Sequence, residues 1–247
     1  IVTRATLRLR PAPAPATTLV ASFATIEDAG RAVSAIVAVA VPSMLELLDR
    51  TTVRAVEAFA HVGLDDSVGA LLVIQSDSAD ARGELDAIEA MCKDQGALLT
   101  VRSSDPAEAD LLLRARRSAH YALKAMGTTL MDDVAVPPAM IPSMLRMLEE
   151  IGARNGVVIG TFGHAGEGNI HPTIVFDATV ADSVAAAWHA FDEIMHAAIA
   201  LGGTITGEHG VGVVKRPYLA HEMDLRLHAA VKRAIDPLGI FNPGKAL

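Results

Sequence analysis

The feature of this sequence that most constrains its fold is an order of predicted strands and helices that occurs twice. Apolar runs of strand length alternate with longer amphipathic segments that carry capping residues. Both halves are predicted as strand, helix, strand, strand, helix, strand when residues 43–48 are taken as a strand. This order is typical of a ferredoxin-like unit. We therefore predict an α+β fold in which two tandem ferredoxin-like units share one antiparallel sheet, with helices on one face and C-terminal helices added.

The predicted elements follow from apolar periodicity, caps and breakers. In the first unit, strands are expected at 17–23, 43–48, 68–76 and 97–102, with helices at 26–39, 51–60 and 80–95. A longer helix at 105–126 joins the units. In the second unit, strands are expected at 128–136, 157–163, 170–176 and 204–206, with helices at 138–154 and 182–201. The tail is expected to be helical over 215–235.

The N-terminal segment differs from the rest of the chain. Residues 1–10 alternate with a period of two, which predicts a strand, and Pro11, Pro13 and Pro15 predict a linker after it. The sequence has no initiator Met and no signal-peptide pattern, so we expect a piece of a larger protein. The expected domains are 1–16, the end of a preceding domain with its linker, and 17–247, with units at about 17–103 and 128–207 and a helical tail over 211–247.

Composition excludes several classes of protein. The chain is 51% hydrophobic and 20% charged, as in globular rather than disordered proteins. A net charge of −8 without a long Lys/Arg run argues against nucleic acid and anionic membranes as partners. No apolar run reaches the roughly 18 residues that a membrane span needs. The single cysteine, Cys92, excludes an internal disulfide and a Cys-rich zinc site, and fits a reducing compartment such as the cytoplasm.

Two Gly-rich stretches carry the residues that point to chemistry. The first reads Gly-His-Ala-Gly-Glu-Gly-Asn-Ile-His-Pro from position 163, and the second Gly-Glu-His-Gly-Val-Gly from position 207. His164, His171 and Glu208 offer two nitrogens and one oxygen, which suit a divalent metal with open positions. His209 is left over as an acid or base. Turn glycines with incidental polar residues would explain any single histidine, but the combination favours a functional site.

The first stretch is predicted to be the turn of a β-hairpin. His164 ends one strand and His171 begins the next, and hairpin pairing can bring such residues opposite each other. Glu208 and His209 follow the last short strand of the same unit, which can lie beside the hairpin. The two stretches are therefore expected to form one site.

Three arginines, Arg114, Arg116 and Arg117, cluster on the helix between the units. We expect two of them to form a solvated basic face. The third can bind a substrate carboxylate through two parallel hydrogen bonds. No G-x-G-x-x-G motif follows a predicted strand, so the sequence predicts no dinucleotide site within this chain.

These motifs resemble a known family. The two Gly-rich stretches, together with Lys215-x-x-Tyr218-Leu219 and Asn242-Pro-Gly-Lys245, resemble the C-terminal half of FAD-linked 2-hydroxy-acid oxidases and dehydrogenases of the vanillyl-alcohol-oxidase-type superfamily. The resemblance is closest to the glycolate oxidase D subunit and D-lactate dehydrogenase branch. Residues 1–9 resemble the end of the family's FAD-binding domain, and residues 42–49 and 133–137 also match, so the resemblance covers essentially the whole chain.

The resemblance implies that this chain is the substrate-binding cap domain of a flavoenzyme. The family cap consists of two ferredoxin-like units, and its FAD is held mainly by an N-terminal domain that is missing here. At the matching positions, His164, His171 and Glu208 are implied as ligands of a divalent metal, Zn²⁺ or Mn²⁺. His209 is implied as the catalytic base. The chain alone is then expected to be inactive without the FAD domain.

The resemblance also implies a substrate. Arg116 would pair with the substrate carboxylate, and Asn242 would approach the flavin. Met131 and Thr173 stand where the members that oxidise D-2-hydroxyglutarate carry Lys and Asn. The implied reaction is oxidation of a small monocarboxylic 2-hydroxy acid, such as glycolate or D-lactate, to the 2-oxo acid.

Two other functions fit part of this pattern. Two histidines and one carboxylate are also the ligands of non-haem iron oxygenases, although those ligands normally project from a β-barrel. A metal-binding regulatory module without catalysis is the second alternative, and the spare His209 argues for an enzyme instead. The expected partners are the 2-hydroxy acid, the missing FAD-binding domain and further chains in a homodimer or hetero-oligomer. The expected location is the cytoplasm, with peripheral membrane attachment as a variant.

Overall fold

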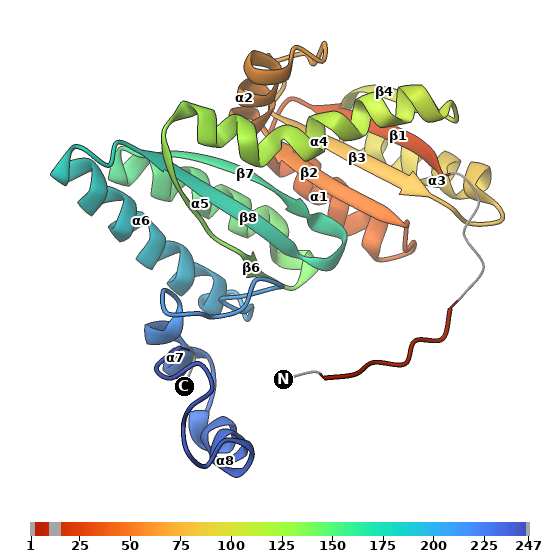
Figure 1. The fold of residues 1–247 in the computed structure, drawn as a ribbon. Helices are drawn as coiled ribbons and strands as arrows, with labels where there is room; N and C mark the ends of the chain where they lie inside the picture. Colours follow the sequence, from red (N-terminus) through yellow and green to blue (C-terminus); the bar gives the residue numbers. More distant parts are fainter. Residues whose placement is uncertain (1–2, 10–15, 246–247) are drawn as a thin grey trace.

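One antiparallel sheet of eight strands is the framework of the computed structural model, which describes residues 3–9 and 16–245 (Figure 1). The strand order is β4-β1-β3-β2-β7-β8-β5, and β6 pairs with β8 beside β5. The strands are β1 (Thr17–Phe23), β2 (Met44–Asp49), β3 (Ala70–Ser76), β4 (Ala97–Ser103), β5 (Thr128–Met131), β6 (Val134–Ala135), β7 (Val158–His164) and β8 (Asn169–Phe176). Residues 43–48, which the sequence left open between strand and helix, therefore lie mainly in a strand.

The first four strands form the first ferredoxin-like unit. Their spatial order β4-β1-β3-β2, with β1 paired to both β3 and β4, is that of a βαββαβ unit. The helices of this unit are α1 (Ile26–Val37), α2 (Arg50–Ala60) and α3 (Ala81–Asp94). Each begins at a side-chain cap; for α1, Thr25 accepts a hydrogen bond from the Asp28 amide, and for α3, Asp80 accepts one from the Gly83 amide. α2 is an addition between the second and third strands.

The second unit repeats the arrangement after the long helix α4 (Pro106–Met126). Its helices are α5 (Ile141–Asn155), which follows a single 3₁₀ turn, and α6 (Ala181–Ala200). The strand predicted at 128–136 is broken into β5 and β6 at Asp132 and Asp133. The short strand predicted at 204–206 is reduced to one bridge between Ala135 and Thr204, which still places that segment beside β6. The prediction of two tandem ferredoxin-like units in one antiparallel sheet is confirmed.

The two units meet where β2 pairs with β7. Three residue pairs join the two halves of the sheet, Glu46 with His164, Leu47 with Gly163 and Leu48 with Phe162. Asp49 then extends the junction with its side chain, because its Oδ2 accepts from the Thr161 amide at 2.8 Å and its Oδ1 accepts from the Thr52 amide at 2.7 Å. The second bond caps the N-terminus of α2. One carboxylate thus ties both units together and starts a helix.

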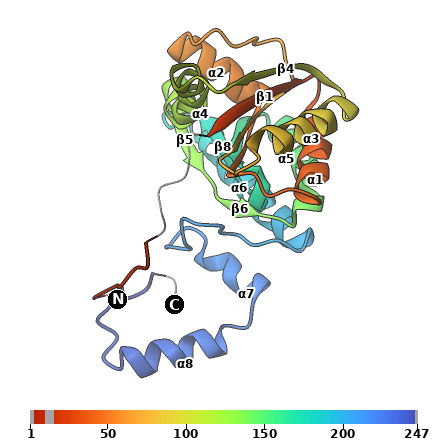
Figure 2. The same cartoon turned by 90° about the vertical axis from the view of Figure 1, so that its right-hand side faces the viewer.

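The two ends of the chain lie away from the sheet (Figure 2). The predicted tail helix is broken into α7 (Leu219–Glu222) and α8 (Leu225–Ile235), with Asp224 capping α8, and α8 has no buried residue. Residues 3–9 form no strand and are exposed, so the strand predicted at 1–10 is wrong over these residues: no described strand pairs with them. The predicted proline linker lies outside the described residues. Among the described residues, no helix has the length and apolar character that crossing a membrane would take.

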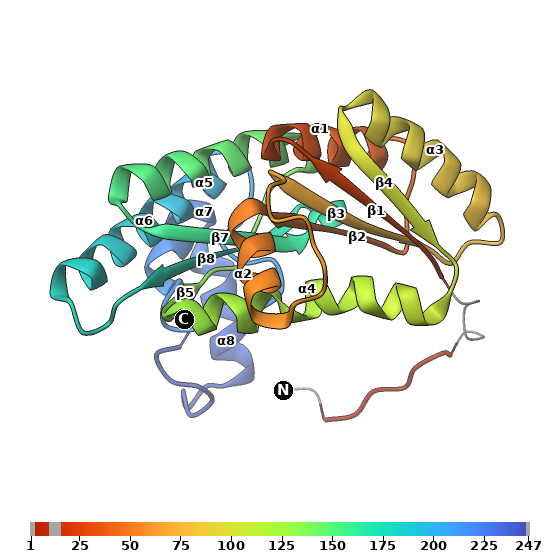
Figure 3. The same ribbon diagram turned by 90° about the horizontal axis from the view of Figure 1, so that it is seen from above.

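Helices cover both faces of the sheet, not one face as the sequence predicted (Figure 3). One core lies between the sheet and α1, α3, α5 and α6, and a smaller second core lies between the opposite face and α2 and α4. The reason is visible in β3, where Ala70 to Ile74 are all buried. A strand that is apolar on both sides needs a cover on both sides. α2 and α4 supply it through residues such as Val53, Val56, Ala119 and Leu123.

The Asp49 junction predicts a measurable loss of stability. Asp49→Ala removes a helix cap and leaves the Thr161 amide without its acceptor, so we expect a loss of about 2–4 kcal/mol in the free energy of unfolding. Asp49→Asn retains one acceptor oxygen and should lose less. Urea unfolding measures both values. The matched control is Asp65→Ala, which removes an exposed turn bond to Ser67; equal losses in Asp49→Ala and Asp65→Ala would contradict this role.

Candidate metal and substrate site

The candidate site lies at the junction of the two units, on the face of the sheet that carries α4. Residue pairing across β2, β7 and β8 sets Glu46 opposite His164 and Phe162 opposite His171. Side chains two residues apart on a strand point to the same face, so Phe162 and His164 bring both pairs to one side. Phe162 belongs to the core under α4, which identifies that side.

Glycines allow two loops to approach each other at this point. Gly168, at the turn between β7 and β8, has φ +79°, and a Cβ there would lie 2.0 Å from the Val136 carbonyl oxygen. A Cβ on Gly207 would lie 2.5 Å from the side chain of Asn169. Neither position has room for a side chain. Glycine at 207 therefore lets the loop of residues 207–209 pack against the hairpin, and glycine at 168 lets the hairpin turn pack against Val136.

The metal ligands predicted from sequence converge. Oε1 of Glu208 lies 3.6 Å from Nε2 of His164 and 3.5 Å from Nε2 of His171. A tetrahedral ion with bonds of ~2.1 Å needs ligand atoms ~3.4 Å apart, so these separations fit a divalent cation with little movement. The three ligand atoms all lie within 4.8 Å of one another.

His209 lies beside this set. Its Nε2 is 3.4 Å from Oε1 of Glu208, and its ring stacks on that of His171 with centroids 5.1 Å apart and planes 7° apart. Gly210, with φ +81°, turns the backbone directly after it. Two adjacent side chains thereby face one point, which an extended segment would not permit.

Arg116 reaches the same point from α4. Its Nε donates to Oε2 of Glu46 at 2.9 Å, and its Nη2 lies 3.4 Å from Nε2 of His164. Its guanidinium carbon stands 5.7 Å from the centre of the Phe162 ring, within the range of a cation–π contact. Arg117 instead forms an exposed pair with Asp110, and Arg114 is exposed, as expected for a solvated face.

Glu46 is a site residue that the sequence did not reveal. Its Oε1 accepts from Nδ1 of His164 at 2.5 Å. Burial works against ionisation of Glu46, but this bond and the charge of Arg116 outweigh it and lower the pKa of the carboxyl. The same hydrogen bond raises the pKa of His164. When a carboxylate accepts a hydrogen bond from one ring nitrogen of a histidine, the other nitrogen is oriented towards a metal, and this arrangement is common around metal-binding histidines. The sequence feature that could have pointed to Glu46 is its position as the one charged residue inside the apolar run Met-Leu-Glu-Leu-Leu, because Glu is seldom buried without a partner.

His171 is the buried member of the set, with only 4% of its side chain exposed. Burial lowers the pKa of its imidazole to about 4, so the ring is neutral at physiological pH. Its Nδ1 has no hydrogen-bond partner among the described residues, and Oδ1 of Asp133 stands 3.8 Å from it. A neutral ring with a free Nε2 is the form in which histidine binds metals.

Three further residues from the sequence analysis take different places. Met131 lies opposite Thr173 across β5 and β8, and Thr173 follows His171 by two residues, so this pair lies on the face of the site. Asn242 is exposed in the tail after α8, and its described contacts include none with the histidines. The structure thus brings all the predicted site residues together except Asn242.

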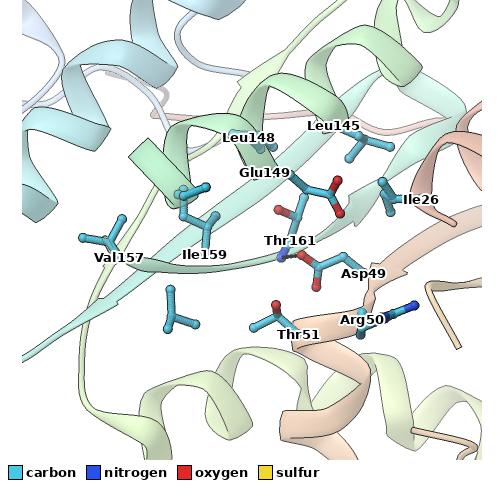
Figure 4. Close-up of a pocket in the computed structure, with 13 residues that line it drawn as sticks. Ile26, Asp49, Arg50, Thr51, Leu145, Leu148, Glu149, Val157, Ile159 and Thr161 are labelled. Carbon is cyan, nitrogen blue, oxygen red and sulfur yellow. Dashed lines mark hydrogen bonds between the residues drawn. The ribbon is translucent and has the colours of Figure 1, made fainter. Parts of the chain in front are cut away.

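A separate cavity of about 350 Å³ contains none of these histidines (Figure 4). It lies between α5 and the start of α2, where β2 and β7 part, and Asp49 and Glu149 point into it. A hollow of about 210 Å³ does reach the site: its wall includes Glu46, His164 and Glu167. Of the predicted metal ligands, His164 therefore borders the smaller hollow, and none lines the larger cavity.

Solved structures share this fold. 4-Ethylphenol oxidase from Gulosibacter chungangensis matches with a TM-score of 0.67 at 16% identity, over 97% of this chain and 55% of that one. At this identity the likeness concerns the fold alone. It defines the class of protein by its architecture, an α+β fold shared with about half of that oxidase.

The chain belongs to the family of FAD linked oxidases, C-terminal domain, whose pattern matches residues 12–246. It is 41% identical over 254 residues to the glycolate oxidase subunit GlcD of Bacillus subtilis, covering 99% of this chain and 54% of that protein. It is 29% identical over 255 residues to a probable mitochondrial D-lactate dehydrogenase of Danio rerio, covering 100% of this chain and 51% of that protein. The resemblance inferred from the motifs is confirmed. The chain spans about half the length of these relatives.

His171 predicts how the stability of the metal-free protein depends on pH. A folded-state pKa of about 4 against 6.5 when unfolded means that protonation favours the unfolded state. Its stabilising effect is complete above pH 6.5 and is lost as the pH falls towards 4, by up to about 3 kcal/mol.

Chemical unfolding between pH 7 and pH 4, with a chelator present, measures this contribution as the difference between wild type and His171→Asn. His164, whose pKa is raised, has the opposite trend, but it is present in both proteins. Parallel curves for the two proteins would contradict a buried neutral His171.

Proposed function

We propose that this chain is the substrate-binding part of an FAD-dependent oxidoreductase that oxidises a small 2-hydroxy acid of the glycolate or D-lactate type with the help of a divalent metal. The observation that carries the proposal is the convergence of His164, His171 and Glu208 on one point, with His209 and Arg116 beside it. A metal-binding set alone would suit many proteins. A free imidazole and a guanidinium at the same point supply the acid–base and carboxylate-binding groups that this reaction needs.

The donor atoms fit a divalent cation. Glu208 accepts no hydrogen bond from any described residue, so its carboxylate is available, and Nε2 of the neutral His171 is free. His164 offers Nε2 while Glu46 holds Nδ1. When bound, the cation would acidify the hydroxyl of the substrate, and FAD would accept the hydride.

The remaining steps belong to side chains of this chain. Arg116 orients the substrate, because Glu46 holds its Nε while Nη1, and Nη2 once a cation takes its place at Nε2 of His164, would be available for the substrate carboxylate. His209 takes the hydroxyl proton, since its ring stacks on His171 and is 42% exposed towards the open side of the site. This division makes His209 a base and not a fourth ligand.

The pair Met131 and Thr173 supports a substrate with one carboxylate. Neither side chain carries a positive charge, and together they occupy neighbouring strands on the face of the site. A second carboxylate would lack a cationic partner there and would lose its hydration. Glycolate and D-lactate avoid this cost.

The alternatives account for less of the geometry. The sheet is open and covered by helices, unlike the β-barrel from which the ligands of non-haem iron oxygenases normally project. A regulatory metal site explains His164, His171 and Glu208 but gives no role to His209 and Arg116.

Metal binding tests the ligand set on this chain alone. We expect one Zn²⁺ or Mn²⁺ to remain after dialysis of the wild type, and a reduction in affinity of at least ~10–100-fold in His171→Ala and Glu208→Gln, because each loses one of three protein ligands. His209→Asn should retain the metal. His189→Ala, an exposed histidine bonded to Asn155, is the matched control. Equal metal retention in wild type and His171→Ala would count against the site.

Turnover tests the base in the full-length protein with its FAD domain. His209→Asn should keep metal and D-lactate binding but lose ~10²–10⁴-fold in turnover, the usual worth of a general base. Dye reduction measures turnover, and His228→Asn, in the helical tail, serves as the control. If the rate of His209→Asn recovers when metal is added in excess, His209 is a ligand and the assignment is wrong.

A further inference from the structure

The loop that carries Glu208 and His209 is held by a single carboxylate, that of Asp133. Its Oδ2 accepts from the amide of Glu208 at 3.0 Å, from the amide of His209 at 2.8 Å and from the hydroxyl of Thr206 at 2.9 Å. Asp133 is almost fully buried. Burial disfavours its charge, but the two amides and the hydroxyl outweigh this effect and lower its pKa, so the carboxylate stays ionised.

The far end of the same loop is anchored to the same place. Nζ of Lys215, only 8% exposed, donates to the main-chain oxygen of Asp133 at 2.8 Å and pairs with Oδ1 of Asp132 at 2.8 Å. Asp132 and Asp133 form the break between β5 and β6. A break in a strand thus provides the acceptors that hold both ends of the loop of residues 206–215.

Asp133 also belongs to a second possible ligand set. Asp133, His171 and His209 offer ligand atoms within 4.8 Å of one another, and this set shares His171 with the set of His164, His171 and Glu208. A cation can use His171 through Nε2 in one set or through Nδ1 near Asp133 in the other.

The two ligand sets differ in the hydrogen bonds that their carboxylates already accept. Asp133 already accepts three donors on Oδ2, and its Oδ1 also accepts from the amide of Glu208 at 3.3 Å and lies 3.8 Å from Nδ1 of His171. No described residue donates a hydrogen bond to the carboxylate of Glu208, which faces Nε2 of His164 and Nε2 of His171. A bound cation would have to compete with the loop amides for Asp133, but it would satisfy a free carboxylate at Glu208.

We propose that Asp133 is a positioning residue and not a metal ligand: it fixes the backbone of Glu208 and His209 so that one side chain faces the metal position and the other stacks on His171. Its Oδ1 also lies 3.8 Å from Nδ1 of His171, where its negative charge favours the tautomer that carries the proton on Nδ1 and leaves Nε2 free. The inference rests on the proposed function for its metal. The hydrogen bonds from Asp133 to the loop, here called the clamp, form without a metal.

Amide exchange tests the clamp without any metal. In the wild type, the amides of Glu208 and His209 should exchange much more slowly than those of Gly210 and Gly212, which have no acceptor among the described residues. Asp133→Asn should weaken this protection, because a neutral amide oxygen is a poorer acceptor for the two amides than an ionised carboxylate oxygen. Equally fast exchange at all four positions in the wild type would overturn the proposal, even if Asp133→Asn does not fold.

Cobalt binding separates a positioning residue from a ligand. With Co²⁺ as the probe, Asp133→Asn should bind ~10–100-fold more weakly than wild type, but its visible absorption at saturation should be unchanged, because the ligands are the same. A changed spectrum at saturation would make Asp133 a ligand and overturn the proposal, and unchanged affinity would overturn it too.

The matched variant Thr206→Val removes one donor from the same carboxylate and leaves both amides, so it should keep its affinity. A wild type that binds no Co²⁺ would refute the metal site of the proposed function, while amide exchange still decides the clamp.

Discussion

Three residue pairs between β2 and β7 are the constraint on which the rest of the structure depends. They join two ferredoxin-like half-sheets into one, and Asp49 prolongs the contact by binding the Thr161 amide where the strands part. Because the pairing is antiparallel, it also sets Glu46 of one unit opposite His164 of the other. The strand pairing that joins the two units therefore also brings Glu46 and His164 into contact at the site. A shift of one residue in register would turn Glu46 to the opposite face and separate it from His164.

The site is organised by how its carboxylates are occupied. Glu46 is held by Arg116 and His164, and Asp133 by the amides of the loop. Glu208 alone accepts no hydrogen bond from the described residues, and it faces two imidazole nitrogens at 3.5 and 3.6 Å. Glu46 and Asp133 thus hold neighbouring groups in place, and the half-exposed carboxylate of Glu208 stays available for the proposed cation. In the proposed function, this distribution leaves His209, adjacent to Glu208, to accept a proton.

Much of the fold could be predicted from sequence, because strand and helix periods are local properties. The repeated order predicted the topology, and the Gly-rich motifs predicted side chains that the structure brings to one point. The features that could not be predicted depend on contacts between distant segments. The helices on the second face follow from packing, and Glu46 became part of the site only because a strand 118 residues later pairs with it. The sequence predicts Asp133 within one strand, since nothing local shows that the strand breaks there to hold a loop. The predicted strand at 1–10 failed over residues 3–9 because a period of two does not supply a partner.

The central claim is that one divalent cation binds where the two units meet. Anomalous diffraction from crystals of this chain soaked in Zn²⁺, measured on both sides of the zinc absorption edge, tests it most directly. The account predicts one strong peak at ~2.0–2.2 Å from Nε2 of His164, Nε2 of His171 and a carboxylate oxygen of Glu208. A peak between Asp133, His171 and His209, or no ordered zinc at either position, would contradict it.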